Sequence, residues 1–141
     1  MMRKLDQRGV AAFEFCLVAG ALFTVMFTIF DLGRFAITVQ SLHYLADAGA
    51  RYWMICYQNS VVQNQSDASC SGDLATNGLL SPSKMQAIAP FLYNGGLTPT
   101  LNASQVGSVV TVTARQPGFT MLMPIWGTGL NAPTASTLIP L

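Results

Sequence analysis

Residues 10–30 form an almost uninterrupted apolar stretch whose only charge is Glu14. As a helix, these 21 residues would measure about 32 Å, which matches the apolar thickness of a bilayer, about 30 Å. Arg3, Lys4 and Arg8 precede the stretch, and basic residues favour the cytoplasmic side of a membrane. The sequence therefore predicts one transmembrane helix with its N-terminus in the cytoplasm and the rest of the chain on the exocytoplasmic side.

The overall composition agrees with a small membrane-anchored protein. Of the 141 residues, 51% are hydrophobic and 9% are charged, whereas about a quarter of an average soluble domain is charged. The length is that of one domain, and this hydrophobicity excludes disorder. A net charge of +1 supplies no basic surface for nucleic acid. We therefore expect a membrane as partner and no nucleic acid.

Three interpretations of the N-terminus are open. Residues 19–21 resemble a signal-peptidase site, but cleavage there would leave residues 22–30 as an apolar new N-terminus. An uncleaved anchor explains the length but not Glu14, because a carboxylate at the centre of a membrane helix costs about 2.5–3.5 kcal/mol. Cleavage after Gly9 would place the new amine of Val10 one helical turn from Glu14. In a stack of subunits, the amine of one can then neutralise the carboxylate of the next.

Residues 8–15, RGVAAFEF, resemble the cleavage region of type IV prepilins. With IFDLGR at 29–34 and ADAGARY at 46–52, the N-terminal third resembles the TadE-like pseudopilins of tight-adherence (Tad, or Flp) pili. The resemblance implies cleavage after Gly9 by a prepilin peptidase, inner-membrane residence before assembly, other pilins as partners, and a role in pilus biogenesis, adhesion and biofilm formation. Phe15, where major Flp pilins commonly carry Tyr, and the long C-terminal region favour a minor pilin or pseudopilin.

The helix is expected to leave the membrane and to continue over residues 31–56, because no proline interrupts this part of the chain. Apolar residues recur there at alternating spacings of three and four, which marks one face of a helix. This packing stripe consists of Leu32, Phe35, Val39, Leu42, Ala46, Gly49 and Trp53. Either its first part faces neighbouring subunits and its last part faces the chain's own head, or all of it belongs to the core of the head.

Two pairs of opposite charges have helical spacing, Asp31 with Arg34 and Asp47 with Arg51. Such pairs contribute about 0.2–0.5 kcal/mol each, and they either set the register between subunits or lie on a solvated face. The single histidine, His43, is accompanied by no nucleophile, no metal-ligand cluster and no phosphate-binding glycine motif. We therefore expect a protein that is not an enzyme and that uses no metal, cofactor or small-molecule substrate.

Cys56 and Cys70 enclose most of residues 57–77, a polar stretch that we expect to be a loop. An exocytoplasmic position is oxidising, and neither cysteine has the spacing of a zinc ligand. A disulfide between them is therefore predicted, with free or intermolecular thiols as the alternatives. Closing a loop of about 15 residues is worth about 3 kcal/mol in the chain-entropy model.

The rest of the sequence predicts a small mixed head. A short helix is expected over residues 83–89, directly after Pro82, and a strand over residues 106–115, where Val, Thr and Ala alternate. Residues 119–126 are apolar and are expected either to be buried against the long helix or to contact another subunit. A last short strand is expected at residues 135–141.

The predicted fold is therefore α+β and pilin-like, with a long N-terminal helix and a short antiparallel sheet in the head. Residues 1–9 would be the cleaved leader, residues 10–30 the transmembrane part of the helix, residues 31–56 its extramembrane continuation, and residues 57–141 the exocytoplasmic head. The alternative function is an uncleaved single-pass membrane protein whose periplasmic head binds a partner.

Overall fold

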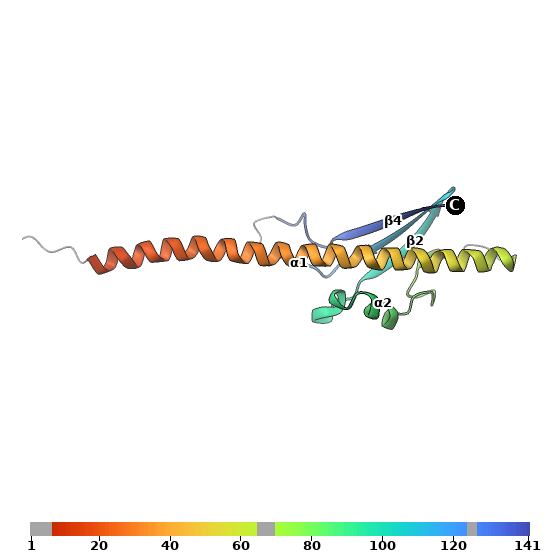
Figure 1. The fold of residues 1–141 in the computed structure, drawn as a ribbon, viewed down its shortest axis with the longest axis horizontal. Coiled ribbons are helices and arrows are strands. Elements are labelled where there is room, and N and C mark those ends of the chain that lie inside the picture. The colour runs from red at the N-terminus through yellow and green to blue at the C-terminus, as the bar shows by residue number, and fades with distance from the viewer. Residues whose placement is uncertain (1–6, 65–69, 124–126) are drawn as a thin grey trace, which may run out of the picture.

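The computed structural model describes residues 7–64, 70–123 and 127–141. Its dominant element is helix α1, Gln7–Val62, whose 56 residues correspond to about 84 Å at about 1.5 Å per residue. Figure 1 shows α1 running the length of the molecule, with all other elements gathered around its C-terminal half. The molecule is therefore a rod with a head at one end.

Helix α1 does not end at Cys56 as expected, and the first part of the predicted polar loop is helical. Tyr57 stacks on Trp53, with the ring centroids 5.2 Å apart, and Ser60 is buried. Polar residues between and after these positions face outward, so this last part of the helix has one packed side. Residues 65–69 of the predicted loop lie outside the described residues.

Four strands form an antiparallel sheet in the order β1-β2-β3-β4. They are β1 (Gly72–Asp73), β2 (Thr100–Val106), β3 (Val109–Arg115) and β4 (Thr134–Pro140). The strand expected over residues 106–115 is thus shorter than predicted, because Gly107, with φ of +61°, turns the chain between β2 and β3. The last strand is confirmed as β4.

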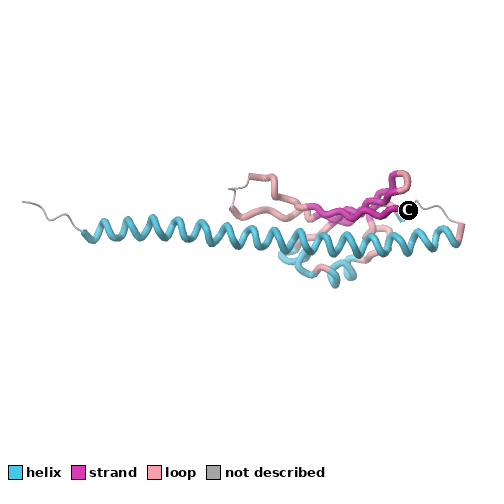
Figure 2. The backbone as a smooth tube through the Cα atoms, turned by 45° about the horizontal axis from the view of Figure 1, so that its top comes forward, coloured by secondary structure: helices cyan, strands magenta, loops and turns pink. Residues whose placement is uncertain are grey.

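The alternation predicted for β3 is confirmed. Val110, Val112 and Ala114 are buried on the face that covers α1, and the intervening residues of β3 are more exposed. Helix α2 (Pro82–Ile88) confirms the predicted short helix, and the 3₁₀ segment η2 (Pro90–Gly96) follows it directly. Figures 1 and 2 show the sheet on one side of α1 and the short helices on another.

The core of the head lies where these layers meet α1. Gly49 marks the closest approach of α1 to the sheet, because a Cβ atom built there would lie 2.9 Å from Leu101 Cδ2 and 3.1 Å from Val112 Cγ1. The buried apolar side chains come from α1, from the segments around α2 and η2, and from the three longer strands. The fold is α+β, as the sequence predicts, and the C-terminal half of α1 is part of the head.

Candidate membrane and assembly surface

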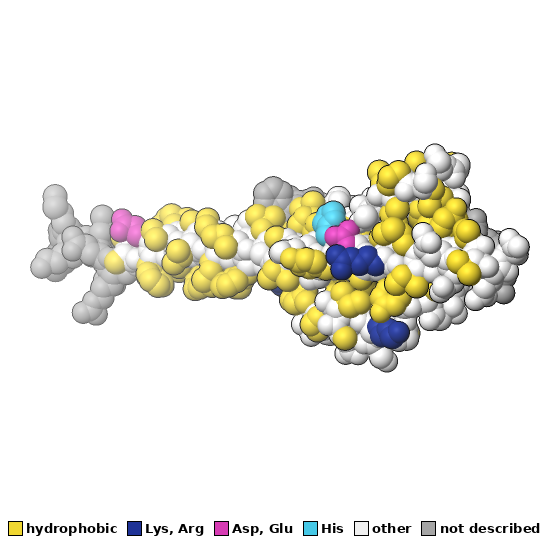
Figure 3. Space-filling view, turned by 45° about the vertical axis from the view of Figure 1, so that its right-hand side comes forward, with side chains coloured by type: hydrophobic (Ala, Val, Ile, Leu, Met, Phe, Trp, Pro, Cys, Tyr) yellow, Lys and Arg dark blue, Asp and Glu magenta, His cyan; other side chains and the backbone are white. Residues whose placement is uncertain are grey.

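The N-terminal half of α1 is bare. None of its most apolar 18-residue window is buried, and among the described residues α1 is the one helix long and apolar enough to cross a membrane. Figure 3 shows hydrophobic side chains around the rod on the face in view. Monomeric soluble proteins rarely expose a continuous apolar surface of this kind. The large exposed side chains are Val10, Phe13, Phe15, Leu17, Val18, Leu22, Phe23, Val25, Met26, Phe27, Ile29 and Phe30.

The hydroxyl groups on this bare surface are satisfied within the helix. Thr24 Oγ1 donates to the carbonyl oxygen of Gly20 at 2.8 Å, and Thr28 Oγ1 donates to that of Thr24 at 2.7 Å. An unsatisfied polar group in hydrocarbon costs several kcal/mol, so these bonds let both threonines face an apolar environment. The surface is therefore compatible with lipid or with an apolar helix of another subunit.

Glu14 is the one acidic side chain on the bare half. Gly9, Val10 and Glu14 are all exposed, and Val10 and Glu14 lie one turn apart on α1. None of the side chains that the structure describes forms an ion pair or hydrogen bond with Glu14. Cys16, close by, is free and exposed.

The predicted packing stripe divides into two parts. Leu42, Ala46 and Trp53 are fully buried in the head, and Gly49 is buried beneath Leu101. The earlier members differ, since Leu32 is exposed and Phe35 and Val39 are only half-buried. The last part of the stripe is therefore the core of the chain's own head, whereas the first part is left largely open.

The buried face at the start of the head is polar instead of apolar. Asp31 and Thr38 are only 1% and 2% exposed, so the buried face is rotated by one residue relative to Leu32 and Val39. Asp31 Oδ2 accepts a hydrogen bond of 3.0 Å from the backbone N–H of Met123, and Arg34 Nη1 lies 3.7 Å from Asp31 Oδ1. Apolar periodicity could not reveal this face, because charged and hydroxyl residues carry it.

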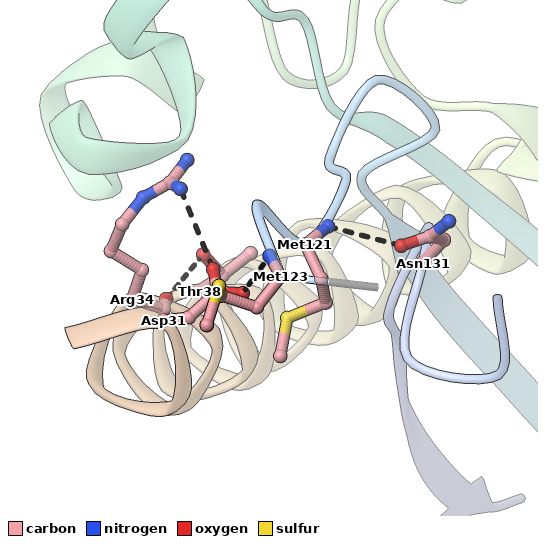
Figure 4. Close-up of polar contacts among 6 residues, drawn as sticks. All are labelled: Asp31, Arg34, Thr38, Met121, Met123 and Asn131. Carbon is pink, nitrogen blue, oxygen red and sulfur yellow. Dashed lines mark hydrogen bonds and ion pairs between the residues drawn. The ribbon is translucent and has the colours of Figure 1, made fainter. Parts of the chain in front are cut away.

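Figure 4 shows how this junction is built. The carboxylate of Asp31 faces the segment that contains Met123, whereas the side chain of Arg34 extends away from that segment. Asn131 Oδ1 accepts the N–H of Met121 at 3.0 Å and so holds the same segment from its other side. Asp31 thus fastens the head to α1 one residue beyond the apolar stretch.

Asp47 and Arg51 lie on the exposed surface of α1, where no ion pair joins them among the described side chains. Asp47 Oδ1 instead accepts a hydrogen bond of 2.6 Å from Thr137 Oγ1 on β4. The carboxylate of Asp47 is therefore used to attach the edge strand to the helix, and the guanidinium of Arg51 is left on the surface.

The predicted disulfide between Cys56 and Cys70 is present, with the two Cα atoms 5.8 Å apart. It joins the last turns of α1 to the segment that leads into β1. Cys70 is fully buried and Cys56 packs against the core. The bridge therefore closes the head at the end farthest from the bare half of α1.

Chemistry-bearing groups are sparse in the head. Among the described residues, no three His, Cys, Asp or Glu side chains lie close enough to hold a metal ion. Burial raises the pKa of the Tyr93 phenol above its ordinary value. A cavity of about 360 Å³ opens between α1, η2 and the segment that follows β3. Of Phe119–Trp126, Phe119 is buried beside this cavity, Leu122 is exposed, and residues 124–126 lie outside the described residues.

The chain thus has a small α+β head carried on a long helix that is bare and apolar at one end. Residues 9–51 match the family model described as "TadE-like protein". This match confirms the resemblance seen in residues 8–15, 29–34 and 46–52, and it spans the bare half of α1 and much of the packed half. No curated protein and no solved structure matches the chain.

Proposed function

We propose that this protein is a minor pilin or pseudopilin of a Tad pilus, a structural subunit without enzymatic activity. The observation that carries the proposal is the bare apolar half of α1 within a segment that matches the TadE-like family. Before assembly this half anchors the chain in the inner membrane, with the N-terminus in the cytoplasm. After assembly it packs with the helices of other pilins, so that lipid is replaced by protein around the same surface.

The leader, residues 1–9, is removed by a prepilin peptidase that cuts between Gly9 and Val10. Two observations support this position. The family match begins at residue 9, and apart from the adjoining helix backbone no described atom lies within 4 Å of the place that a Cβ of Gly9 would occupy, so the described part of the head does not cover the bond after it. Cleavage gives Val10 a free amine at the tip of the apolar helix.

Glu14 then selects and aligns subunits. Its carboxylate is exposed on an apolar surface and has no partner among the described side chains, which is costly in hydrocarbon. The Val10 amine of a neighbouring subunit supplies a counter-charge at the matching height. The pair neutralises both groups inside the filament and fixes the axial register between helices.

The outward-facing head sets lateral contacts. Phe35 and Val39 are half-buried in the single chain and lie beside the exposed Tyr44, along a shallow groove on α1. This part of the stripe is available to neighbouring subunits, as the first of the two interpretations of the sequence requires. Through such contacts the subunit supports pilus biogenesis and, with it, adhesion and biofilm formation.

Intact-mass measurement of the protein from cells that contain the peptidase tests the proposal. The expected mature chain begins at Val10. Glu14→Gln should be cleaved and inserted normally but should not enter pili, whereas Thr24→Val, a change of similar size on the same bare surface, should assemble normally. A chain that still carries residues 1–9 would support the second candidate, an uncleaved single-pass protein whose periplasmic head binds a partner. Normal pilus incorporation of Glu14→Gln would remove the role of the carboxylate.

A further inference from the structure

The cavity between α1, η2 and the segment after β3 has the properties of a ligand site. Its volume of about 360 Å³ lies within the range of small-ligand pockets, about 300–1,000 Å³. Its wall is mostly apolar in area and also carries the polar side chains of Arg34, Thr38, Asn94 and Gln116, a mixture that is typical of sites that bind an organic molecule. The principal wall residues are Arg34, Phe91, Leu92, Leu97, Gln116 and Phe119.

Two polar groups of the wall lack full partners. Gln116 is 1% exposed; its Nε2 donates to the carbonyl oxygen of Leu92 at 2.8 Å, but its Oε1 has no hydrogen-bond partner among the described residues. A buried acceptor left unpaired costs about 1–3 kcal/mol. Arg34 lies 5.5 Å above the ring of Phe119, and 43% of its side chain is exposed. The site therefore offers a cation to a ligand, whereas the Oε1 of Gln116 is buried in the wall, and a ligand reaches it only after a local shift of the wall.

The height of the cavity along α1 restricts what that ligand can be. Arg34 is four residues beyond Phe30, the last residue of the apolar stretch, and therefore about 6 Å farther along the helix axis. The headgroup layer of one leaflet is about 5–7 Å thick. When the apolar stretch spans a bilayer, the guanidinium lies at the level of the lipid phosphates.

Below Arg34, the same face of α1 is aromatic. Phe30, Phe27 and Phe23 precede Arg34 by four, seven and eleven residues, which places them in one row on a helix. All three are more than half exposed, and the rings of Phe23 and Phe27 stack with centroids 6.4 Å apart. A cavity that holds a cation and lies above an apolar row complements a molecule with a phosphate at one end and acyl chains at the other.

We infer that this cavity binds the headgroup of a phospholipid from the head-side leaflet, with the phosphate on Arg34 and the acyl chains along the phenylalanine row. The buried carboxylate of Asp31 stays behind Arg34 and holds it in place. Gln116 favours headgroups that can donate a hydrogen bond, namely the ammonium of phosphatidylethanolamine or the hydroxyls of phosphatidylglycerol. Phosphatidylcholine has no such donor. The inference rests on the membrane-anchored state of the proposed function but not on cleavage or pilus assembly.

Native mass spectrometry of the full chain in a non-ionic detergent, with each of the three phospholipids added in turn, tests the inference. The wild-type chain should retain one molecule of phosphatidylethanolamine or phosphatidylglycerol and much less phosphatidylcholine. Arg34→Gln should reduce retention by about tenfold, because a hydrogen bond to a charged group is lost. Arg34→Lys should restore much of it. Arg51→Gln, which removes an arginine from the exposed surface of the same helix, should retain lipid as the wild type does.

Gln116→Met removes the acceptor but leaves Asp31 and Arg34 untouched, and it also removes the buried hydrogen bond from Gln116 Nε2 to Leu92. We expect it to retain the three phospholipids about equally, and hydrogen exchange of β3, measured in parallel, reports the cost of that lost bond to the head. Equal retention by wild type and Arg34→Gln, or an unchanged preference in Gln116→Met, would overturn the inference. Failure of the membrane anchor is distinguishable, since the chain would then be released from membranes by alkaline carbonate whatever its lipid selectivity.

Discussion

The two halves of α1 both carry apolar side chains, but one half is exposed and the other packs against the head. The bare half carries large side chains such as Phe13, Phe23 and Phe30 on its surface, and nothing in the described part of the chain covers them. The packed half carries Ala46 and Gly49 where the sheet comes closest, so backbone meets side chain at short range. Large residues can contact lipid or a neighbouring helix without a fixed partner. Small residues at one position indicate a partner of fixed shape, here the chain's own head.

The largest effect should come from removing a large buried side chain from the packed half of α1. Trp53 is fully buried and stacked on Tyr57, so Trp53→Ala should lower the free energy of unfolding of the head by about 3–5 kcal/mol. Phe23→Ala removes an exposed ring from the bare half and should leave the head unchanged. Hydrogen exchange of the β3 amides in detergent measures both. Equal loss of protection in the two variants would mean that the halves are not independent.

Substitutions at the cysteines test the same difference between the packed half and the bare half of α1. Breaking the bridge with Cys56→Ser and Cys70→Ser should destabilise the head by about 3 kcal/mol, because the unfolded chain regains the freedom of a loop of about 15 residues. Cys16→Ser, in the bare half, should have no effect on the head. Thermal unfolding of the head with and without reductant checks the difference. A thiol titration should find one reactive thiol in the native protein and three after unfolding and reduction.

Substitutions at two glycines test how closely α1 approaches the sheet. Gly49→Ala places a methyl group against Leu101 and Val112, and such overpacking should cost about 1–3 kcal/mol. At Gly20, apart from the adjoining helix backbone, no described atom lies within 4 Å of the position that an added methyl group would take, so Gly20→Ala should leave the stability of the head as it is. Denaturant unfolding monitored by tryptophan fluorescence compares the two. A neutral Gly49→Ala would show that the sheet can move away from α1.

The halves also differ in how far the sequence could predict them. The bare half follows from a run of apolar residues of bilayer length, and the deep core follows from Leu42, Ala46 and Trp53 at helical spacing. The junction could not be predicted this way, because Asp31 is buried by a bond to Met123, ninety-two positions away in the chain. Apolar periodicity records burial among apolar groups, and it carries no signal for a buried carboxylate that is satisfied by a distant backbone N–H.

Local turn chemistry and tertiary contacts account for the other differences. The alternating pattern does not reveal the β2–β3 hairpin, because it continues from Val106 to Val109, although Gly107 has the positive φ that separates the two strands. Helical spacing alone pairs Asp47 with Arg51. In the structure, Asp47 Oδ1 accepts a hydrogen bond from the hydroxyl of Thr137, because β4 brings that hydroxyl closer to the carboxylate than the guanidinium of Arg51 is. The spacing of residues along one helix carries no information about a competing hydrogen-bond donor that the tertiary fold brings close.

The smallest expected effect concerns this last contact. The hydrogen bond from Thr137 to Asp47 lies on the surface, so Thr137→Val should destabilise the head by only about 0.5 kcal/mol. Thr24→Val in the bare half should cost the head nothing, because its hydroxyl bonds only within α1. Arg51→Gln should also be neutral. Hydrogen exchange along β4 resolves effects of this size. Greater loss of β4 protection in Arg51→Gln than in Thr137→Val would mean that Asp47 serves the helix rather than the sheet, and that this edge is attached in another way.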